Sequence, residues 1–252
     1  MNQSQRRQFL IRELLNDKNV EIPHDAKSQK LLLRGLMNVR RPYEIDSNFL
    51  AVQDAYLKQE TQNKGVVDAD AFKDGISLWQ GDITRLKCDA IVNAANSAML
   101  GCFIPNHKCI DNCIHTYAGI QLRLECASIM HRQGHDESTG KAKITYGYNL
   151  PCEYVIHTVG PIIYDKVRQS DEKLLRSCYV SCLELAEEKE LSSIAFCCIS
   201  TGEFHFPNEL AAKIAIEAVK QFMGHSKYVK KVIFNVFKDI DKEIYARLLQ
   251  DF

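Results

Sequence analysis

The sequence lacks an excess of charge of either sign. Its 252 residues include 32 basic and 32 acidic side chains, so the formal net charge at pH 7 is zero. This balance gives no overall electrostatic reason to expect binding to nucleic acid or to a membrane. Long apolar runs are also missing, since none approaches the roughly 20 residues that a membrane helix needs. The start, MNQSQRRQFLIRELLND, lacks the apolar core of a signal peptide. We therefore expect a cytoplasmic protein.

Cysteine is absent from the first 87 residues, although ten cysteines follow. In a cytoplasmic protein, free thiols and metal ligands are expected in preference to disulfides. Most of these cysteines are expected to be small buried residues, such as Cys178 and Cys182, which lie one helical turn apart. Neither a Rossmann G-x-G-x-x-G nor a Walker motif is present. Any nucleotide site must therefore be built in another way.

The first part of the chain, residues 1–75, carries helical patterns and no obvious chemistry. Apolar stripes run through residues 9–15 and 32–37, and Asp46 or Ser47 can cap a third helix. We interpret this part as a helical N-terminal extension that serves packing or the docking of a partner.

From Ile76 onward, short apolar strands alternate with helical patterns. Strands are expected at Ile76–Gln80, Ala90–Val92, Ala142–Thr145, Tyr154–Val159, Ile194–Ile199 and Val232–Phe237, and helices at Asp111–Met130, Asp171–Glu190, Asn208–Met223 and Asp239–Leu249. This alternation predicts an α/β domain over 76–252, with a mostly parallel sheet covered by helices on both faces. A ligand is then expected at the carboxyl ends of the strands.

A candidate metal site lies in the segment that follows the second strand. Cys102, His107 and Cys109 fall within eight residues, and two thiolates with one imidazole can close on a zinc ion. Three protein ligands are typical of a catalytic zinc site, which leaves a position for water or substrate. The alternative is two buried cysteines and a surface histidine, but Pro105 and its neighbours favour a loop. Cys113 is expected in the core, and His115 as a supporting group outside the ligand set.

Other polar segments follow the remaining strand ends, and each has an ordinary structural alternative. Asp82 can accept a hydrogen bond from a base amine or cap a turn, and Asn93-Ala94-Ala95-Asn96 can bind sugar hydroxyls or form an Asx turn. Asp111 can orient water or a ribose, or simply favour a helix start. The 199–207 segment can cradle a diphosphate with backbone N–H groups, and Phe237 can stack on a base or pack in the core.

Taken together, these segments resemble a macrodomain, the ADP-ribose-binding α/β fold. The resemblance covers about residues 76–252 and rests on five ordered motifs: Gly81-Asp82-Ile83-Thr84, Asn93-Ala94-Ala95-Asn96, Ile110-Asp111-Asn112-Cys113-Ile114-His115, Ile156-His157-Thr158-Val159-Gly160-Pro161 and Ser200-Thr201-Gly202-Glu203-Phe204-His205-Phe206-Pro207. The segment from Cys102 to Cys109 replaces the usual glycine-rich loop. In this respect the chain is similar to the zinc-dependent macrodomains of bacteria, which also carry a helical N-terminal extension. The implied fold is a three-layer α/β/α macrodomain with a mixed, mostly parallel sheet.

The resemblance also implies roles for residues. Asn96 and Asp111 would be catalytic, and Cys102, His107 and Cys109 would hold Zn²⁺. The ADP-ribose contacts would come from Asp82, Ile83, Asn96, Ile110, Asp111, Asn112, Ser200, Thr201, Gly202, Glu203, Phe204 and Phe237.

The implied activity is a zinc-dependent hydrolase that removes mono-ADP-ribose from modified, acidic protein side chains. This branch is associated with sirtuin-type ADP-ribosyltransferases and with a lipoylated carrier related to the glycine cleavage H protein. We expect a monomer with no nucleic-acid or membrane partner. Two alternatives remain: an ADP-ribose reader in which zinc only braces the loop, and a hydrolase of small derivatives such as O-acetyl-ADP-ribose.

Overall fold

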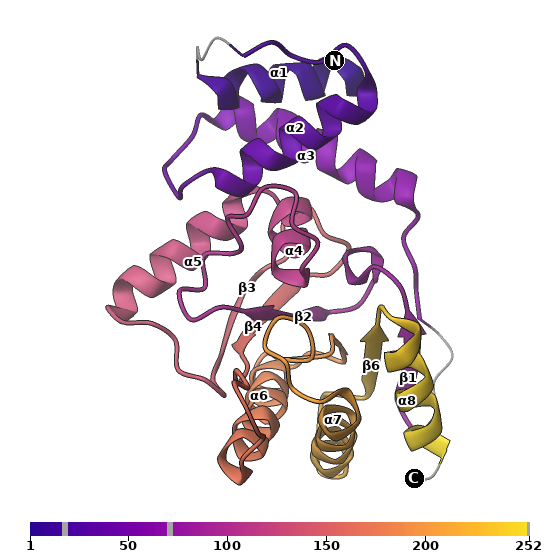
Figure 1. Ribbon diagram of the computed structural model, residues 1–252. Coiled ribbons are helices and arrows are strands. Elements are labelled where there is room, and N and C mark those ends of the chain that lie inside the picture. Colours follow the sequence, from indigo (N-terminus) through magenta and orange to yellow (C-terminus); the bar gives the residue numbers. More distant parts are fainter. Residues whose placement is uncertain (17–19, 70–72, 251–252) are drawn as a thin grey trace.

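The structure is a computed structural model that describes residues 1–16, 20–69 and 73–250 (Figure 1). Parts of the expected helical extension, residues 17–19 and 70–72, lie outside the described residues. In the described part the chain forms eight α-helices, one 3₁₀-helix and six strands. In chain order these are α1 (Gln3–Leu15), α2 (Ala26–Val39), α3 (Ser47–Lys64), β1 (Ile76–Gln80), η1 (Ile83–Arg85), β2 (Ala90–Ala95), α4 (Ile110–Ala118), α5 (Ile120–Gln133), β3 (Ala142–Tyr146), β4 (Tyr154–Val159), α6 (Gln169–Glu188), β5 (Ser193–Phe196), α7 (Asn208–Met223), β6 (Lys231–Val236) and α8 (Asp239–Gln250).

The six strands form one mixed sheet in the order β1-β6-β5-β2-β4-β3. All neighbouring pairs are parallel except β3 with β4, which is antiparallel. The prediction of a mixed, mostly parallel sheet is therefore confirmed. Because the parallel strands point the same way, the segments that follow β1, β2, β4, β5 and β6 emerge at one edge of the sheet, where a ligand is expected.

Helices cover both faces of this sheet. Helices α4 and α5 lie on the side that faces the N-terminal helices, and α6 and α7 lie on the opposite side (Figure 1). Strands β2, β4, β5 and β6 are almost entirely buried between them, which explains their continuous apolar sequences. The three-layer α/β/α architecture is thus confirmed. None of the described helices is both long and apolar enough to cross a membrane.

The three N-terminal helices have a small core of their own. Leu10, Leu33, Phe49 and Leu57 are buried there together with Ile120 from α5. Asp46 is the residue that caps α3, because its side chain accepts a hydrogen bond from the backbone N–H of Asn48 at 2.7 Å. Since Ile120 belongs to this core, the extension packs against the α/β part through shared apolar contacts.

The expectation of one helix over Asp111–Met130 is wrong, because the chain breaks at Gly119 between α4 and α5. Gly119 has a φ of 98°, and a Cβ at this position would lie 2.7 Å from Nε2 of Gln53. Gln53, from α3, also accepts a hydrogen bond from the backbone N–H of Ile120 at 3.0 Å. The break therefore depends on a long-range contact with the extension, which local helical periodicity does not show.

The fifth strand is also shorter than expected. It ends at Phe196 rather than at Ile199. After it the chain turns sharply, since Ser200 has a φ of 65° and Thr201 donates to the carbonyl oxygen of Cys198 through both its amide and its hydroxyl, at 3.4 and 3.0 Å. The apolar residues 197–199 thus lead into a site loop instead of extending the sheet.

Candidate metal and ADP-ribose site

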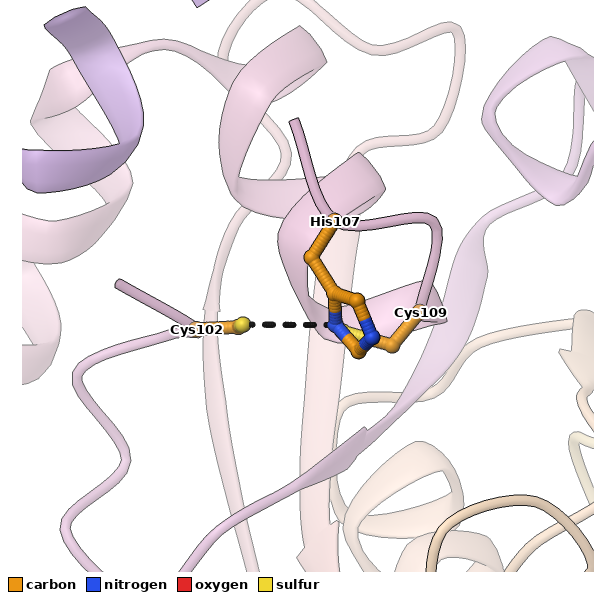
Figure 2. A group of neighbouring side chains, drawn as sticks. All are labelled: Cys102, His107 and Cys109. Carbon is orange, nitrogen blue, oxygen red and sulfur yellow. Dashed lines mark hydrogen bonds between the residues drawn. The ribbon is translucent and has the colours of Figure 1, made fainter. Parts of the chain in front are cut away.

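The segment Gly101–Cys109, called the metal loop below, brings its three candidate ligands together (Figure 2). Sγ of Cys102 lies 3.6 Å from Nδ1 of His107, and the ligand atoms of both residues and of Cys109 all lie within 4.8 Å of one another. Zinc bonds of about 2.3 Å to sulfur and about 2.0–2.1 Å to nitrogen place tetrahedral S and N ligands about 3.6 Å apart. The donor set and its spacing therefore fit a zinc ion.

The metal loop ends at the N-terminus of α4, and this position affects its last ligand. Sγ of Cys109 accepts a hydrogen bond from the backbone N–H of Asn112 at 3.4 Å, so Cys109 caps the helix. Burial raises the pKa of the Cys109 thiol to about 12, and this N–H only partly opposes the rise. Because zinc is bound by the thiolate, ion binding must release the proton.

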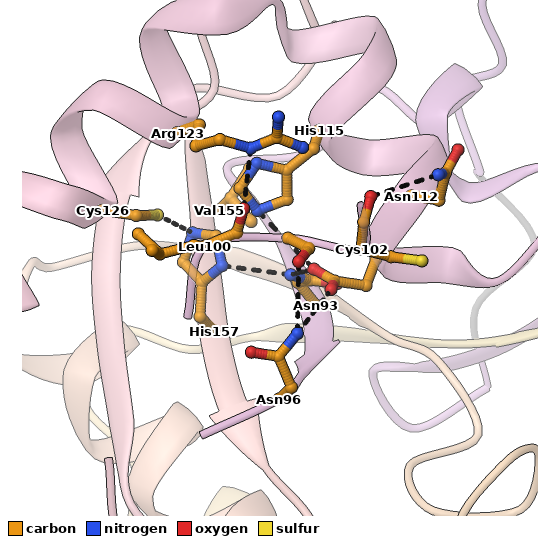
Figure 3. Close-up of polar contacts among 12 residues, drawn as sticks. Asn93, Asn96, Leu100, Cys102, Asn112, His115, Arg123, Cys126, Val155 and His157 are labelled. Carbon is orange, nitrogen blue, oxygen red and sulfur yellow. Dashed lines mark hydrogen bonds and ion pairs between the residues drawn. The ribbon is translucent and has the colours of Figure 1, made fainter. Parts of the chain in front are cut away.

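Asp111 lies one residue beyond the first position of α4 and is held by amide side chains. Its Oδ1 accepts a hydrogen bond from Nδ2 of Asn93 at 2.8 Å, and its Oδ2 accepts a weaker one from Nδ2 of Asn96 at 3.5 Å. Asn96 also donates to the carbonyl oxygen of Gly101 at 3.2 Å (Figure 3). The two asparagines of the Asn93–Asn96 motif thus fix the carboxylate beside the metal loop.

Burial raises the pKa of Asp111 to about 6, although the bond from Asn93 and the charge of Arg123 work in the opposite direction. At neutral pH this carboxylate is mostly ionised, yet its pKa is closer to 7 than that of an ordinary aspartate. A carboxylate with these properties is suited to accept a proton during a reaction.

A second group of metal-ligand types lies behind Asp111 in the core, and sequence reasoning missed it. His115, Cys126 and His157 are all buried, and their ligand atoms lie within 4.8 Å of one another. His157 is already engaged, since its Nδ1 lies 3.1 Å from Nδ2 of Asn93 (Figure 3). Its Nε2 lies 2.9 Å from Oγ1 of Thr145. Since Asn93 also holds Asp111, this group supports the carboxylate from behind.

The outcome for two further expectations follows from these contacts. His115 does lie outside the ligand set, with Nε2 3.6 Å from Oδ1 of Asp111. The interpretation of Cys113 as a core residue is wrong, because it is only half-buried and its Sγ accepts a hydrogen bond from Arg34 of α2 at 3.3 Å. The apolar face of α4 at this position meets the extension rather than the sheet.

The loop after β5 presents groups suited to an anionic ligand. Ser200 is buried and its Oγ has no hydrogen-bond partner in the described residues. The backbone N–H groups of Gly202, Glu203 and Phe204 also have no hydrogen-bond acceptor among the described residues. Oε1 of Glu203 lies 3.9 Å from Nε2 of His107. The predicted phosphate loop and the metal loop are therefore neighbours.

Asp82 follows the carboxyl end of β1, where it is half-buried and already has hydrogen-bond partners. Its Oδ1 accepts hydrogen bonds from the amide and hydroxyl of Thr84, at 3.0 and 2.6 Å, and its Oδ2 lies 3.2 Å from Nζ of Lys64. Burial acts to raise the pKa of Asp82, but these bonds and the Lys64 charge outweigh it and lower the pKa. The Ile83 side chain is in the core, and Phe237 is 76% exposed, so Phe237 is not a packing residue here.

The remaining predicted residues lie at the start of α4. Ile110 is half-buried against the main core. Asn112 is completely buried, and its Nδ2 donates to the carbonyl oxygens of Cys102 and Ile104 at 3.3 and 2.9 Å. Its side chain therefore holds the metal loop from inside, while its backbone N–H bonds Cys109 and its carbonyl oxygen accepts from Oγ1 of Thr116. The structure brings together Asn96, the metal loop, Asp111 and the 200–204 loop, while Asp82 and Phe237 lie at the ends of β1 and β6.

Comparison with known proteins agrees with this fold. The family model described as Macro domain matches residues 92–215. A protein-ADP-ribose hydrolase of Treponema medium is 50% identical over 99% of this chain and 100% of its own length. A protein-ADP-ribose hydrolase of Staphylococcus aureus (strain MRSA252) is 48% identical over 95% of this chain and 93% of its own. The chain therefore belongs to the macro domain family.

Solved structures and a more distant relative support the same assignment. The Oceanobacillus iheyensis macrodomain with ADP superimposes with a TM-score of 0.64 at 35% identity, covering 73% of this chain and 94% of the other. The Trypanosoma brucei macrodomain in complex with ADP-ribose gives a TM-score of 0.66 at 29% identity over 85% and 94%. The ADP-ribose glycohydrolase MACROD1 of Bos taurus is 42% identical over 89% of this chain and 69% of its own.

Proposed function

We propose that this protein is a zinc-dependent hydrolase that removes mono-ADP-ribose from modified protein side chains. The names of its bacterial relatives support the removal of ADP-ribose from protein. One observation in the structure carries the proposal: Asp111, with a pKa of about 6, lies two residues from Cys109 at the start of α4. A candidate base and a candidate metal site thus share one helix N-terminus, an arrangement that suits metal-assisted hydrolysis.

Cys102, His107 and Cys109 would hold the ion, and Zn²⁺ bound there would polarise the ribose and lower the pKa of a bound water toward about 7. Asp111 would accept a proton from the attacking water. Asn93 and Asn96 would keep the carboxylate in place through the bonds at 2.8 and 3.5 Å. Positioning of this kind supplies much of the rate enhancement in hydrolytic enzymes.

The rest of the ligand would lie along the strand edge. Oδ1 of Asn96 and Oγ of Ser200 are buried acceptors without a partner in the described residues, and each would bond a hydroxyl or a phosphate-linked group of ADP-ribose. The free N–H groups of residues 202–204 would hold the diphosphate. Asp82 would accept from the adenine amine, with Ile83 beside it and Phe237 stacked on the base. Ile110 would offer its backbone, and Asn112 would act through the metal loop that its side chain holds.

Four further proposals come with this function. Residues 76–252 would form the ADP-ribose-binding domain, and residues 1–75 the helical extension. The modified side chains would be acidic residues, on a target such as a lipoylated carrier related to the glycine cleavage H protein. The modification would be introduced by a sirtuin-type transferase. The protein would act as a cytoplasmic monomer.

The first test is the release of free ADP-ribose from a mono-ADP-ribosylated protein by as-purified and chelator-stripped enzyme. Release that disappears on stripping and returns with zinc supports the proposal. Release that is unaffected by stripping contradicts the role of zinc but not the hydrolase. No release from any preparation that still binds ADP-ribose indicates a reader instead. Parallel assays with O-acetyl-ADP-ribose separate a hydrolase of small derivatives from one that acts on protein.

A further inference from the structure

Helix α2 of the N-terminal extension lies directly against the metal loop. Nη2 of Arg34, from the middle of α2, donates hydrogen bonds to the carbonyl oxygen of His107 at 2.7 Å and to Oδ1 of Asn112 at 2.9 Å. The same nitrogen donates to Sγ of Cys113 at 3.3 Å. One guanidinium nitrogen from the extension therefore holds the backbone of a candidate metal ligand.

The contact through Asn112 extends this hold to the other end of the loop. Asn112 receives its bond from Arg34 on Oδ1, and its Nδ2 donates to the carbonyl oxygens of Cys102 and Ile104 at 3.3 and 2.9 Å. The buried amide thus links the backbone of the first ligand to Arg34. Both Cys102 and His107 are connected to the same side chain of α2.

Asn38, one turn further along α2, makes a second contact with the loop. Its Oδ1 accepts a hydrogen bond from the backbone N–H of Asn106 at 2.9 Å, and its Nδ2 donates to Oγ1 of Thr116 at 2.9 Å. Between the two contacts lies Gly35, where a Cβ would come within 3.4 Å of Nδ2 of Asn106. Asn106 itself has a φ of 57°. A left-handed backbone position next to His107 is therefore fastened to the extension.

The entrance to the loop is fixed at the end of α2. Arg123 of α5 donates through Nε to the carbonyl oxygen of Leu100 at 2.7 Å. Through Nη1 it donates to the carbonyl oxygens of Met37, Asn38 and Arg40 at 3.2, 2.9 and 2.5 Å. Its guanidinium lies 4.3 Å from the centre of the Phe103 ring, which also faces Arg41 of the extension at 4.8 Å. The loop is thus attached to α2 at its entrance, its middle and its end.

We propose that Arg34 is a positioning residue of the metal site, and that the N-terminal extension completes this site instead of only flanking it. The proposal rests on the proposed function, because it requires that Cys102, His107 and Cys109 bind zinc. Arg34 holds the loop in the conformation in which Sγ of Cys102 and Nδ1 of His107 lie 3.6 Å apart. A free loop of this length would first have to be ordered by the ion, which lowers its affinity.

The test measures zinc affinity by competition with a chelator, on the full chain, for the wild type, Arg34→Met and Arg34→Lys. Methionine keeps an apolar stem but has no donor, so zinc affinity should fall about 10- to 100-fold, as for other groups that orient metal ligands. Lysine should recover much of it, because all three acceptors bond one nitrogen and an ammonium has three donors. The absorption spectrum of the cobalt-substituted protein should change in Arg34→Met, since it reports ligand geometry.

Arg12→Met is the matched control, because Arg12 is an exposed arginine of α1, and it should bind zinc as the wild type does. Asn38→Ala, which leaves Arg34 in place, should weaken zinc binding in the same direction. Wild-type zinc affinity and cobalt spectrum in a folded Arg34→Met would overturn the inference alone. If that variant does not fold, wild-type zinc affinity in a folded Arg34→Gln, which lacks the charge and the reach of the guanidinium, has the same meaning. A wild type that binds no zinc would instead overturn the proposed metal site, and the inference with it.

Discussion

The structure contains two clusters of histidine and cysteine side chains, and they differ in burial and in the hydrogen bonds that they already make. Cys102, His107 and Cys109 are half-buried on a loop that begins after β2 and ends at the start of α4. His115, Cys126 and His157 are buried in the core between α4, α5 and β4. Both clusters satisfy a simple distance criterion for a metal, so residue type and proximity do not distinguish them.

Their existing hydrogen bonds do distinguish them. In the metal loop a backbone N–H donates to Sγ of Cys109 and partly opposes the rise in pKa that burial causes. In the core, Nε2 of His157 bonds Thr145, and burial raises the pKa of Cys126 above its usual range and lowers that of His115 well below its own. An ion there would require His157 to break its bonds to Asn93 and Thr145. The ring nitrogens of His115 have no hydrogen-bond partner in the described residues, and its Nε2 lies 3.6 Å from Oδ1 of Asp111. We infer that the cluster in the metal loop binds a metal ion and that the cluster in the core orients Asp111.

The largest expected effect is the difference in zinc binding between two variants that each lose one thiol, Cys109→Ala and Cys126→Ala. Cys109→Ala should lower zinc affinity by more than about 100-fold, since losing only an orienting group costs about 10- to 100-fold, and should abolish the release of ADP-ribose. Cys126→Ala should keep its full zinc content. Zinc per chain, measured by elemental analysis after dialysis, gives the answer. Loss of zinc from Cys126→Ala with retention in Cys109→Ala would reverse the assignment.

The next effect concerns Asp111, which lies between the two clusters. Asp111→Asn preserves the shape of the side chain but cannot accept a proton, so turnover should fall by about 10²- to 10⁴-fold. Zinc content should remain that of the wild type, because Asp111 is not among the candidate ligands. Single-turnover release of ADP-ribose measures the first quantity and elemental analysis the second. Near-normal turnover would remove Asp111 from the mechanism.

A smaller effect is expected from the core cluster itself. Thr145→Val removes the hydroxyl that bonds Nε2 of His157 and leaves a buried polar atom without its partner, which should cost about 1–3 kcal/mol of unfolding free energy. Turnover should fall modestly because His157 supports Asn93 and, through it, Asp111. Denaturant unfolding and zinc titration check this together. A change in zinc affinity at unaltered stability would show that the core cluster does contribute to metal binding.

The two clusters also differ in how much of each could be predicted from the sequence. The metal loop was visible because its ligands lie within eight residues and a proline indicates a loop. The α/β alternation was visible because strands buried on both faces are continuously apolar. Of the core cluster, His115 and His157 belong to motifs noted in the sequence, but Cys126 does not. Only the register of β2 with β4, which places Asn93 opposite His157, brings the support for Asp111 together.

The contacts of the N-terminal extension with the metal loop were even harder to predict from the sequence. Arg34 is one of three basic residues on the amphipathic helix α2, and its three acceptors lie more than 70 residues further along the chain. The break at Gly119 likewise depends on Gln53 of α3. Both features arise from tertiary contacts between segments whose local patterns are ordinary, so periodicity and spacing alone do not predict them.

The smallest expected effect is a pH dependence of turnover that Asp111 can produce and the histidines of the core cluster cannot. Burial raises the pKa of Asp111 to about 6, and the carboxylate must be ionised to accept a proton, so turnover should decline as the pH falls through about 6. At pH 6 the rate should be about half its maximum, with a tenfold loss for each further unit, because one proton is bound.

The residual activity of Asp111→Asn should lack this decline at low pH. The histidines of the core cluster cannot substitute for it, since burial lowers the pKa of His157 to about 3. An identical decline in the variant would move the titration to the zinc-bound water or its ligands, and would leave the core cluster with a structural role only.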